Sequence, residues 1–110
     1  MNLLAWLRAR APAPPEALSA RVVDALGSRA TEDASRASEL CLAAATELLE
    51  QLLKQEPLGR ESAIDLLAAD ALVTYAFEAA ANDIDQLDAR ATAAMTQLAA
   101  LTGESGRSSA

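Results

Sequence analysis

The sequence predicts an all-α protein, on three observations. Apolar residues make up 52% of the chain but aromatic residues only 3%, so most of the apolar content is alanine and leucine. Both are strong helix formers, whereas the β-branched and aromatic residues typical of strands are scarce. The four glycines and four prolines lie between periodic segments or in the C-terminal tail, not within those segments.

We therefore expect a helical bundle. Its predicted parts are an antiparallel three-helix core at about 34–55, 61–81 and 83–102, a short helix at about 15–26 as a fourth member, and an N-terminal amphipathic helix at about 2–10. The corresponding domain division is 1–14 for the amphipathic helix and a proline-rich linker, 15–103 for a single bundle domain, and 104–110 for a disordered tail.

The composition of the chain also disfavours several classes of function. A net charge of −7 disfavours binding of nucleic acid, which needs cations to neutralise phosphates. The chain has no histidine, so it cannot build a Ser-His-Asp or Cys-His catalytic group or the Glu-x-x-His ligands of a di-iron bundle. No glycine-rich phosphate loop occurs. We expect a non-enzyme with no catalytic residues, no cofactor and no metal.

The expected compartment is the cytoplasm. The single cysteine, Cys41, rules out a disulfide within the chain, as is usual in a reducing environment. No apolar run reaches the ~18 residues of a membrane span. The N-terminus lacks the pattern of a secretory signal, which places positive charge before a longer apolar stretch.

Residues 2–10 predict a short amphipathic helix with Leu3, Leu4 and Leu7 on one face and the only tryptophan, Trp6, beside them. Two roles stay open. The helix packs back on the bundle or on a second subunit, in which case Leu3, Trp6 and Leu7 are interface residues. Alternatively, it lies at a membrane surface through Trp6 and its arginines, and so short a helix would bind there only weakly.

The next segments have clear boundaries. The stretch 11–15 is a stiff linker, and Pro15 suits the first position of a helix that Gly27 ends as a left-handed cap. A polar connection follows at 28–33. In the helix at 34–55, one buried row is expected to hold Cys41, Ala45, Leu48 and Leu52, which makes Cys41 a small core residue rather than a reactive thiol. The motif at 56–59 stops this helix.

The segment 61–81 is apolar in nearly every direction, at about 100° per residue, and we expect it to be the covered centre of the bundle. Asp70 lies within it among leucines and alanines. A buried carboxylate needs a partner or a proton, so Thr46, Arg21 or Arg36 is expected to contact it. The predicted buried polar residues are therefore Asp70, Thr46 and Thr74.

The stretch from Leu66 to Ala81 resembles one helix of the trans-type isoprenyl diphosphate synthases. The matching residues are Asp70, Ala71, Leu72, Ala76, Phe77 and Glu78, and Ala69 stands where that family usually has glycine. The two aspartate-rich motifs of the family have no counterpart in this chain. The resemblance implies a similar packing of a central helix, without the activity.

The last helix is expected to follow a turn at Asn82–Asp83 and to end at Gly103. Its apolar residues have a 3-4-3-4-3 spacing, which is typical of a helix that packs at a shallow angle along a partner. The partner is either another helix of the same chain or a helix of a second copy. These residues are Ile84, Leu87, Ala91, Ala94, Leu98 and Leu101.

The leading hypothesis for function is a small, non-enzymatic helical interaction protein, which acts either as a dimer that self-associates through apolar helix faces or as an accessory subunit of another protein. Leu87, Ala91, Ala94, Leu98 and Leu101 are its interface candidates in the last helix. One alternative is a binding module for an apolar small molecule or lipid, held near Ala91, Ala94 and Asp70. Another is a regulator that contacts membranes through residues 1–10.

Overall fold

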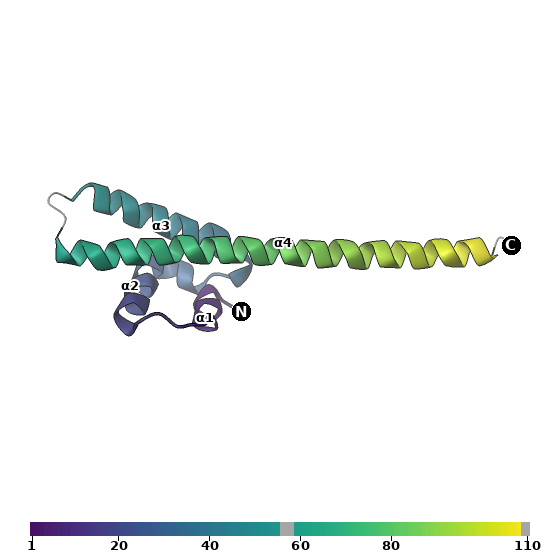
Figure 1. Cartoon of the computed structure of the whole chain (residues 1–110), viewed down its shortest axis with the longest axis horizontal. Coiled ribbons are helices and arrows are strands. Elements are labelled where there is room, and N and C mark those ends of the chain that lie inside the picture. The colour runs from purple at the N-terminus through teal and green to yellow at the C-terminus, as the bar shows by residue number, and fades with distance from the viewer. Residues whose placement is uncertain (56–58, 109–110) are drawn as a thin grey trace. The chain divides into compact units, whose positions relative to one another are not determined.

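The computed structural model describes residues 1–55 and 59–108, without the side chains of Glu61 and of residues 102–108. The helices in chain order are α1 (Leu3–Arg8), α2 (Glu16–Leu26), α3 (Ala37–Leu53) and α4 (Arg60–Ser108), with the 3₁₀ turns η1 (Gly27–Thr31) and η2 (Ala34–Arg36) before α3 (Figure 1). Over the described residues there is no strand, only an isolated bridge between Asn2 and Asp33. The all-α prediction is confirmed.

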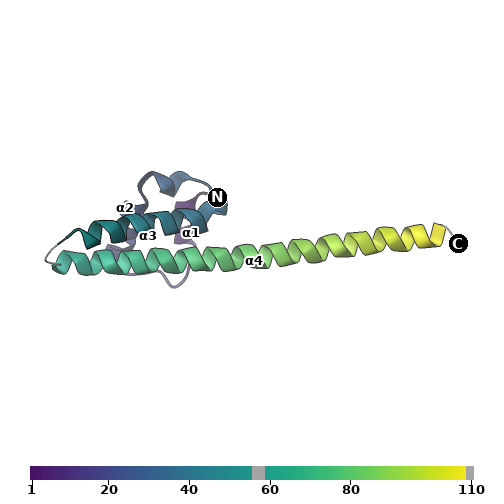
Figure 2. The same cartoon turned by 90° about the horizontal axis from the view of Figure 1, so that it is seen from above.

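The chain divides into two units, Met1–Ala79 and Ala80–Ala110. The boundary lies inside α4 and inside the range 15–103 for which the sequence predicts one domain. In the first unit, α3 runs antiparallel to the beginning of α4 and lies alongside it (Figure 1, Figure 2). The core described below belongs to this first unit.

The predicted turn at Asn82–Asp83 is wrong, because α4 is one helix of 49 residues. No glycine or proline occurs between Arg60 and Thr102. Asparagine and aspartate inside a helix cost only about 0.7 kcal/mol each relative to alanine, and the alanine-rich sequence on both sides outweighs that cost. The segments 61–81 and 83–102 therefore form one helix, not an antiparallel pair. The helix also includes Gly103 and residues 104–108, where a cap and a disordered tail were expected.

The N-terminal half of the bundle departs from the sequence-based boundaries in small ways. Pro15 is the N-cap of α2, one residue before its predicted position. Gly27 ends α2 with φ 55° and ψ −128°, a conformation available to glycine but outside the left-handed helical region that we expected. The chain then continues directly into η1, where the Arg29 guanidinium donates two hydrogen bonds, of 2.5 and 3.0 Å, to the Glu47 carboxylate on α3.

Helix α3 is shorter than predicted. Residues 34–36 form η2, which Asp33 caps by accepting a 2.9 Å hydrogen bond from the Ser35 N–H. Hydrogen bonds from the Ser35 hydroxyl and from the Ser35 N–H lower the pKa of Asp33. At the other end α3 stops at Leu53 with Lys54 as its C-cap. The expected stop at Glu56-Pro57-Leu58 lies outside the described residues.

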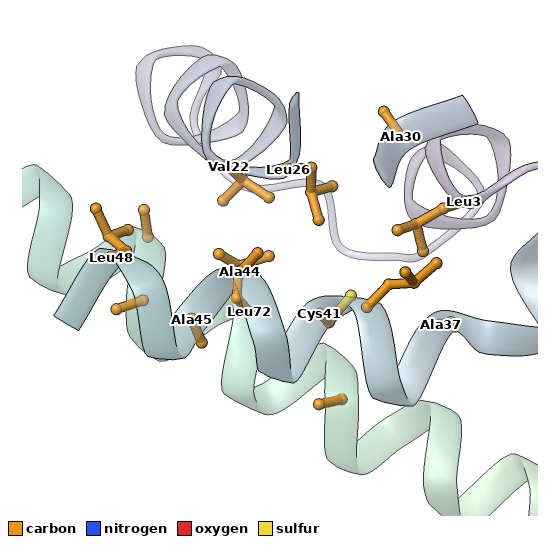
Figure 3. Close-up of a cluster of buried hydrophobic side chains, with 14 of the residues drawn as sticks. Leu3, Val22, Leu26, Ala30, Ala37, Cys41, Ala44, Ala45, Leu48 and Leu72 are labelled. Carbon is orange, nitrogen blue, oxygen red and sulfur yellow. The ribbon is translucent and has the colours of Figure 1, made fainter. Parts of the chain in front are cut away.

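The core of the first unit is built where α1, α2, α3 and α4 converge (Figure 3). Leu3, Leu26, Cys41 and Leu72, one from each helix, are its largest fully buried side chains. The predicted row of α3 is buried throughout: Cys41, Ala45, Leu48 and Leu52. Many other core residues are alanines, so the helix backbones can lie close together.

The segment 61–81 is not covered on most sides, contrary to expectation. One face of it is buried and consists of small residues around Leu72: Ala68, Ala69, Ala76 and Ala79. On other faces Leu66, Leu67 and Phe77 are 47%, 57% and 70% exposed. The physical reason is the continuity of α4, because residues 82 and 83 form no turn and the expected antiparallel helix pair does not form.

We predict that Leu72→Ala lowers the free energy of unfolding by about 2–5 kcal/mol, because it removes a fully buried side chain from a packed core. Leu67→Ala deletes the same atoms at an exposed position of the same helix. It should change the free energy of unfolding by less than about 1 kcal/mol. Urea titration followed by Trp6 fluorescence measures both. Equal losses in the two variants would contradict the packing described.

Candidate functional site

The second unit exposes a regular apolar row. We call it the C-terminal seam, and it consists of Ile84, Leu87, Ala91, Ala94, Leu98 and Leu101. Its four large side chains are between 60% and 64% exposed, and the neighbouring Met95 is 70% exposed. Every described side chain from 81 to 101 is exposed. A contiguous apolar surface of this kind marks an interaction site more often than scattered exposed leucines do.

Charge is distributed unevenly along the same helix segment. Asp83, Asp85, Asp88 and Arg90 carry all the charge between residues 80 and 101, and the eleven residues from Ala91 to Leu101 are uncharged. In heptad terms the seam occupies the a and d positions, beginning with Ile84 at a. Asp83 and Arg90 then occupy g and Asp88 occupies e, the positions that flank a helix pair. The seam is thus apolar along its length and acidic beside its first half only.

Helix α1 is docked on the first unit by both backbone and side chains. The Leu3 N–H donates a 2.8 Å hydrogen bond to the Glu32 carbonyl, and the Ala34 N–H donates one of 3.0 Å to the Met1 carbonyl. The Leu3 side chain is fully buried, and Leu4, Trp6 and Leu7 pack against the core. Of the two roles left open by the sequence, the structure shows packing on the bundle of the same chain. The interface candidates Leu3, Trp6 and Leu7 are engaged within the chain.

An aromatic and ionic cluster fixes α1 against α4. The rings of Trp6 and Tyr75 meet edge to face, with centroids 6.4 Å apart. The Arg10 guanidinium lies 4.4 Å from the Trp6 ring centroid and forms an ion pair of 2.7 Å with Glu78. Burial, together with the nearby Glu78 carboxylate, raises the pKa of Tyr75. No sequence pattern predicts this cluster, because Trp6 and Arg10 are more than 60 positions away from Tyr75 and Glu78.

A cavity of about 620 Å³ opens between α1, the linker and α2. Its lining is mainly apolar, with charged side chains among the lining residues; these include Leu4, Leu7, Arg8, Arg10, Glu16, Ala20, Val22, Val23, Asp24 and Tyr75. The expected ligand position near Ala91, Ala94 and Asp70 does not coincide with it, since none of the three lines this cavity. The linker that borders it contains a cis peptide bond between Ala11 and Pro12.

The three predicted buried polar residues are all exposed, which corrects that expectation. Thr46 and Thr74 donate hydrogen bonds to carbonyls of their own helices, those of Leu42 at 2.8 Å and Asp70 at 3.0 Å. Asp70 escapes burial because it lies on the side of α4 away from Leu72, two residues further on at about 200° around the helix.

The partners expected for Asp70 are engaged elsewhere. Arg21 pairs with Asp65 at 2.5 Å and with Asp24 at 2.9 Å. Arg36 pairs with Glu32 and Glu39. The buried polar side chain found instead is Ser62, whose hydroxyl lies 3.2 Å from the Gln55 side-chain oxygen.

Cys41 is a free, fully buried thiol, and burial raises its pKa to about 11. Within the part of the chain that the structure describes, no three histidine, cysteine or acidic side chains gather closely enough to hold a metal ion. Over the same residues, no helix combines the length and the apolar character needed to cross a membrane.

Comparison with known proteins gives no relative: no family model, curated protein or solved structure matches the chain. The resemblance of residues 66–81 to an isoprenyl diphosphate synthase helix therefore stays a prediction.

We predict that alkaline pH destabilises the protein through Cys41. Its pKa rises from an ordinary 9.0 to about 11 in the folded state, so the folded protein keeps the proton that the unfolded chain releases. The stabilisation is complete below pH 9 and is lost as pH rises towards 11. Urea unfolding at pH 8, 9 and 10 measures the slope. Cys41→Ala should show a shallower decline than the unmodified chain, whatever its stability at pH 8, and identical slopes would contradict the assignment.

Proposed function

We propose that the protein is a non-enzymatic helical interaction protein that self-associates through the C-terminal seam. The observation that carries the proposal is the seam itself: four large apolar side chains, each at least 60% exposed, in a strict heptad pattern on one helix. Exposed apolar area costs about 25 cal/mol per Å², and pairing with a second helix removes that cost.

The first unit has no need of these residues. Its hydrophobic core is drawn entirely from positions between Leu3 and Ala79. The second unit would also be helical without them, because alanine alone satisfies helix propensity. Leucine and isoleucine at every third or fourth position therefore call for another explanation, and a partner helix supplies it.

The residue composition, the buried cysteine and the net charge also fit an interaction role. The sequence has no histidine, and its one cysteine is buried, so it lacks the residues of a Ser-His-Asp or Cys-His catalytic group. Cytoplasmic residence is part of the proposal, since an unpaired thiol is usual in a reducing compartment. The net charge of −7 argues against nucleic acid as the partner.

We predict that Leu87→Glu weakens self-association at least 10-fold, because it places a carboxylate in the middle of an apolar contact. Gln86→Glu adds the same charge one position away, outside the seam, and should change the dissociation constant less than about threefold. Sedimentation equilibrium at several protein concentrations measures both. An unmodified chain that is monomeric up to 100 µM would remove the proposal.

A second candidate function rests on the cavity beside α1. A volume of about 620 Å³ is within the range of small-molecule sites, and its lining combines apolar side chains with Tyr75 and charged groups. A small apolar molecule is the matching ligand class. A membrane role for residues 1–10 has less support, because Leu3 and its neighbours pack in the core of the chain.

We predict that N-phenyl-1-naphthylamine, an apolar fluorescent probe, binds the unmodified protein and that Ala20→Phe weakens this binding at least fivefold by filling the cavity. Ala17→Phe is the control, since Ala17 is an exposed residue of α2 that does not line the cavity. Fluorescence titration measures both affinities. Equal binding by the two variants would exclude this cavity as the site.

A further inference from the structure

We infer that two copies of the chain pair antiparallel through the C-terminal seam, with Ala91 of one copy opposite Ala94 of the other. This inference rests on the proposed function and adds the orientation and register of the pair. Three properties of the second unit carry it: the order of side-chain sizes in the seam, the placement of charge beside it, and its limited length.

The seam is symmetric in size about its middle. Two large residues, Ile84 and Leu87, precede Ala91 and Ala94, and two more large residues follow. In an antiparallel pair centred on the alanines, Ile84 meets Leu101 of the second copy and Leu87 meets Leu98. Small residues then lie together where the helices approach most closely, and large residues fill the wider spaces on either side.

This register is the one that uses the whole seam. With Ala91 opposite Ala94, all six residues of each copy meet a seam residue of the other. Shifting the register by one heptad in either direction places two of the six opposite residues outside the seam. The seam spans fewer than three heptads, so each lost layer removes a large share of the contact.

The sizes of the seam side chains fit either orientation. The charges beside the seam therefore distinguish antiparallel from parallel pairing. In a parallel pair in register, Asp83 at g would face Asp88 of the second copy at e, and this repulsion would occur twice. The carboxylates of Asp83, Asp85 and Asp88 from both copies would also gather at one end of the pair. No cation at the flanking positions offsets them, since Arg90 would face Met95.

In the antiparallel pair the acidic half of each helix lies beside the uncharged half of the other. Asp85 and Asp88 are then level with Ala100 and Gln97 of the second copy, which are uncharged. Asp83 at g lies nearest Glu104 at g of the second copy, so the advantage over parallel pairing is that the aspartates of the two copies lie at opposite ends of the pair. Exposure of the described side chains leaves this face accessible along its length. The repulsion avoided depends on ionic strength, because salt screens exposed charges within about 8 Å under physiological conditions.

Disulfide formation between single-cysteine additions tests the orientation. Leu87→Cys and Leu98→Cys chains, one of them bearing a mass tag, are mixed in a glutathione buffer and separated without reductant. The mixed 87–98 disulfide should exceed the 87–87 disulfide at least 10-fold. In the antiparallel pair the two residues at position 87 are displaced by eleven residues, about 16 Å along the axis. A disulfide needs Cα atoms within about 7 Å. The unmodified chain reports any contribution from the buried Cys41.

The outcomes separate orientation from association. A dominant 87–87 disulfide would overturn antiparallel pairing while leaving self-association in place. A monomeric unmodified chain would instead overturn the proposed function.

If either cysteine variant is itself monomeric, nitroxide labels outside the seam, at Gln86→Cys and Ala99→Cys, replace the disulfide assay. The inference then requires a short distance between position 86 of one copy and 99 of the other, and a longer distance between the two positions 86. The reverse order would overturn it.

Discussion

The continuity of α4 through Asn82 and Asp83 constrains both units of the structure. Each residue of a helix interior is held by backbone hydrogen bonds four positions apart, and α4 has no glycine or proline between Arg60 and Thr102 to interrupt them. The segment 83–102 is consequently not a partner for 61–81. The first unit closes its core with α1, α2 and α3, and the large side chains of the seam are exposed.

Helix α1 is one of the elements that closes the core. Although it has only six residues, it contributes Leu3 to the fully buried set and contacts α4 through Trp6 and Tyr75. Two backbone hydrogen bonds fix its position against the connection before α3: the Leu3 N–H donates to the Glu32 carbonyl, and the Met1 carbonyl accepts from the Ala34 N–H. So short a helix is unstable by itself in water, and its stability here comes from these tertiary contacts. The first unit is compact because its two ends in sequence meet, since Trp6 of α1 contacts Tyr75 of α4 close to the end of the unit at Ala79.

Sequence reasoning succeeded where one periodic signal dominated. The row Cys41, Ala45, Leu48 and Leu52 was predictable because polar residues mark the opposite face of α3 clearly. It failed at Asn82–Asp83, because those residues favour both turns and helix N-termini and only the surrounding alanines decide between them. It failed at Asp70 because apolar residues on every side give no direction for burial. The pairing of Arg21 with Asp65 requires the tertiary arrangement and has no local signature.

The candidate functional site was likewise predictable only in part from the sequence. The spacing of the seam residues was evident in the sequence, whereas their exposure depended on whether α4 turned back. The cavity beside α1 had no sequence signal, because it is bordered by a linker, two short helices and Tyr75 of α4, whose relative positions are set by packing.

The order of the units along the chain has a consequence for biosynthesis. All the residues of the hydrophobic core lie between Leu3 and Ala79, and the seam begins at Ile84. A polypeptide is made from its N-terminus, and domains can fold as they emerge. All the core residues are therefore translated before the C-terminal seam. They leave the ribosome ahead of the seam residues, so two chains pair through their seams only after the core residues of both have been made.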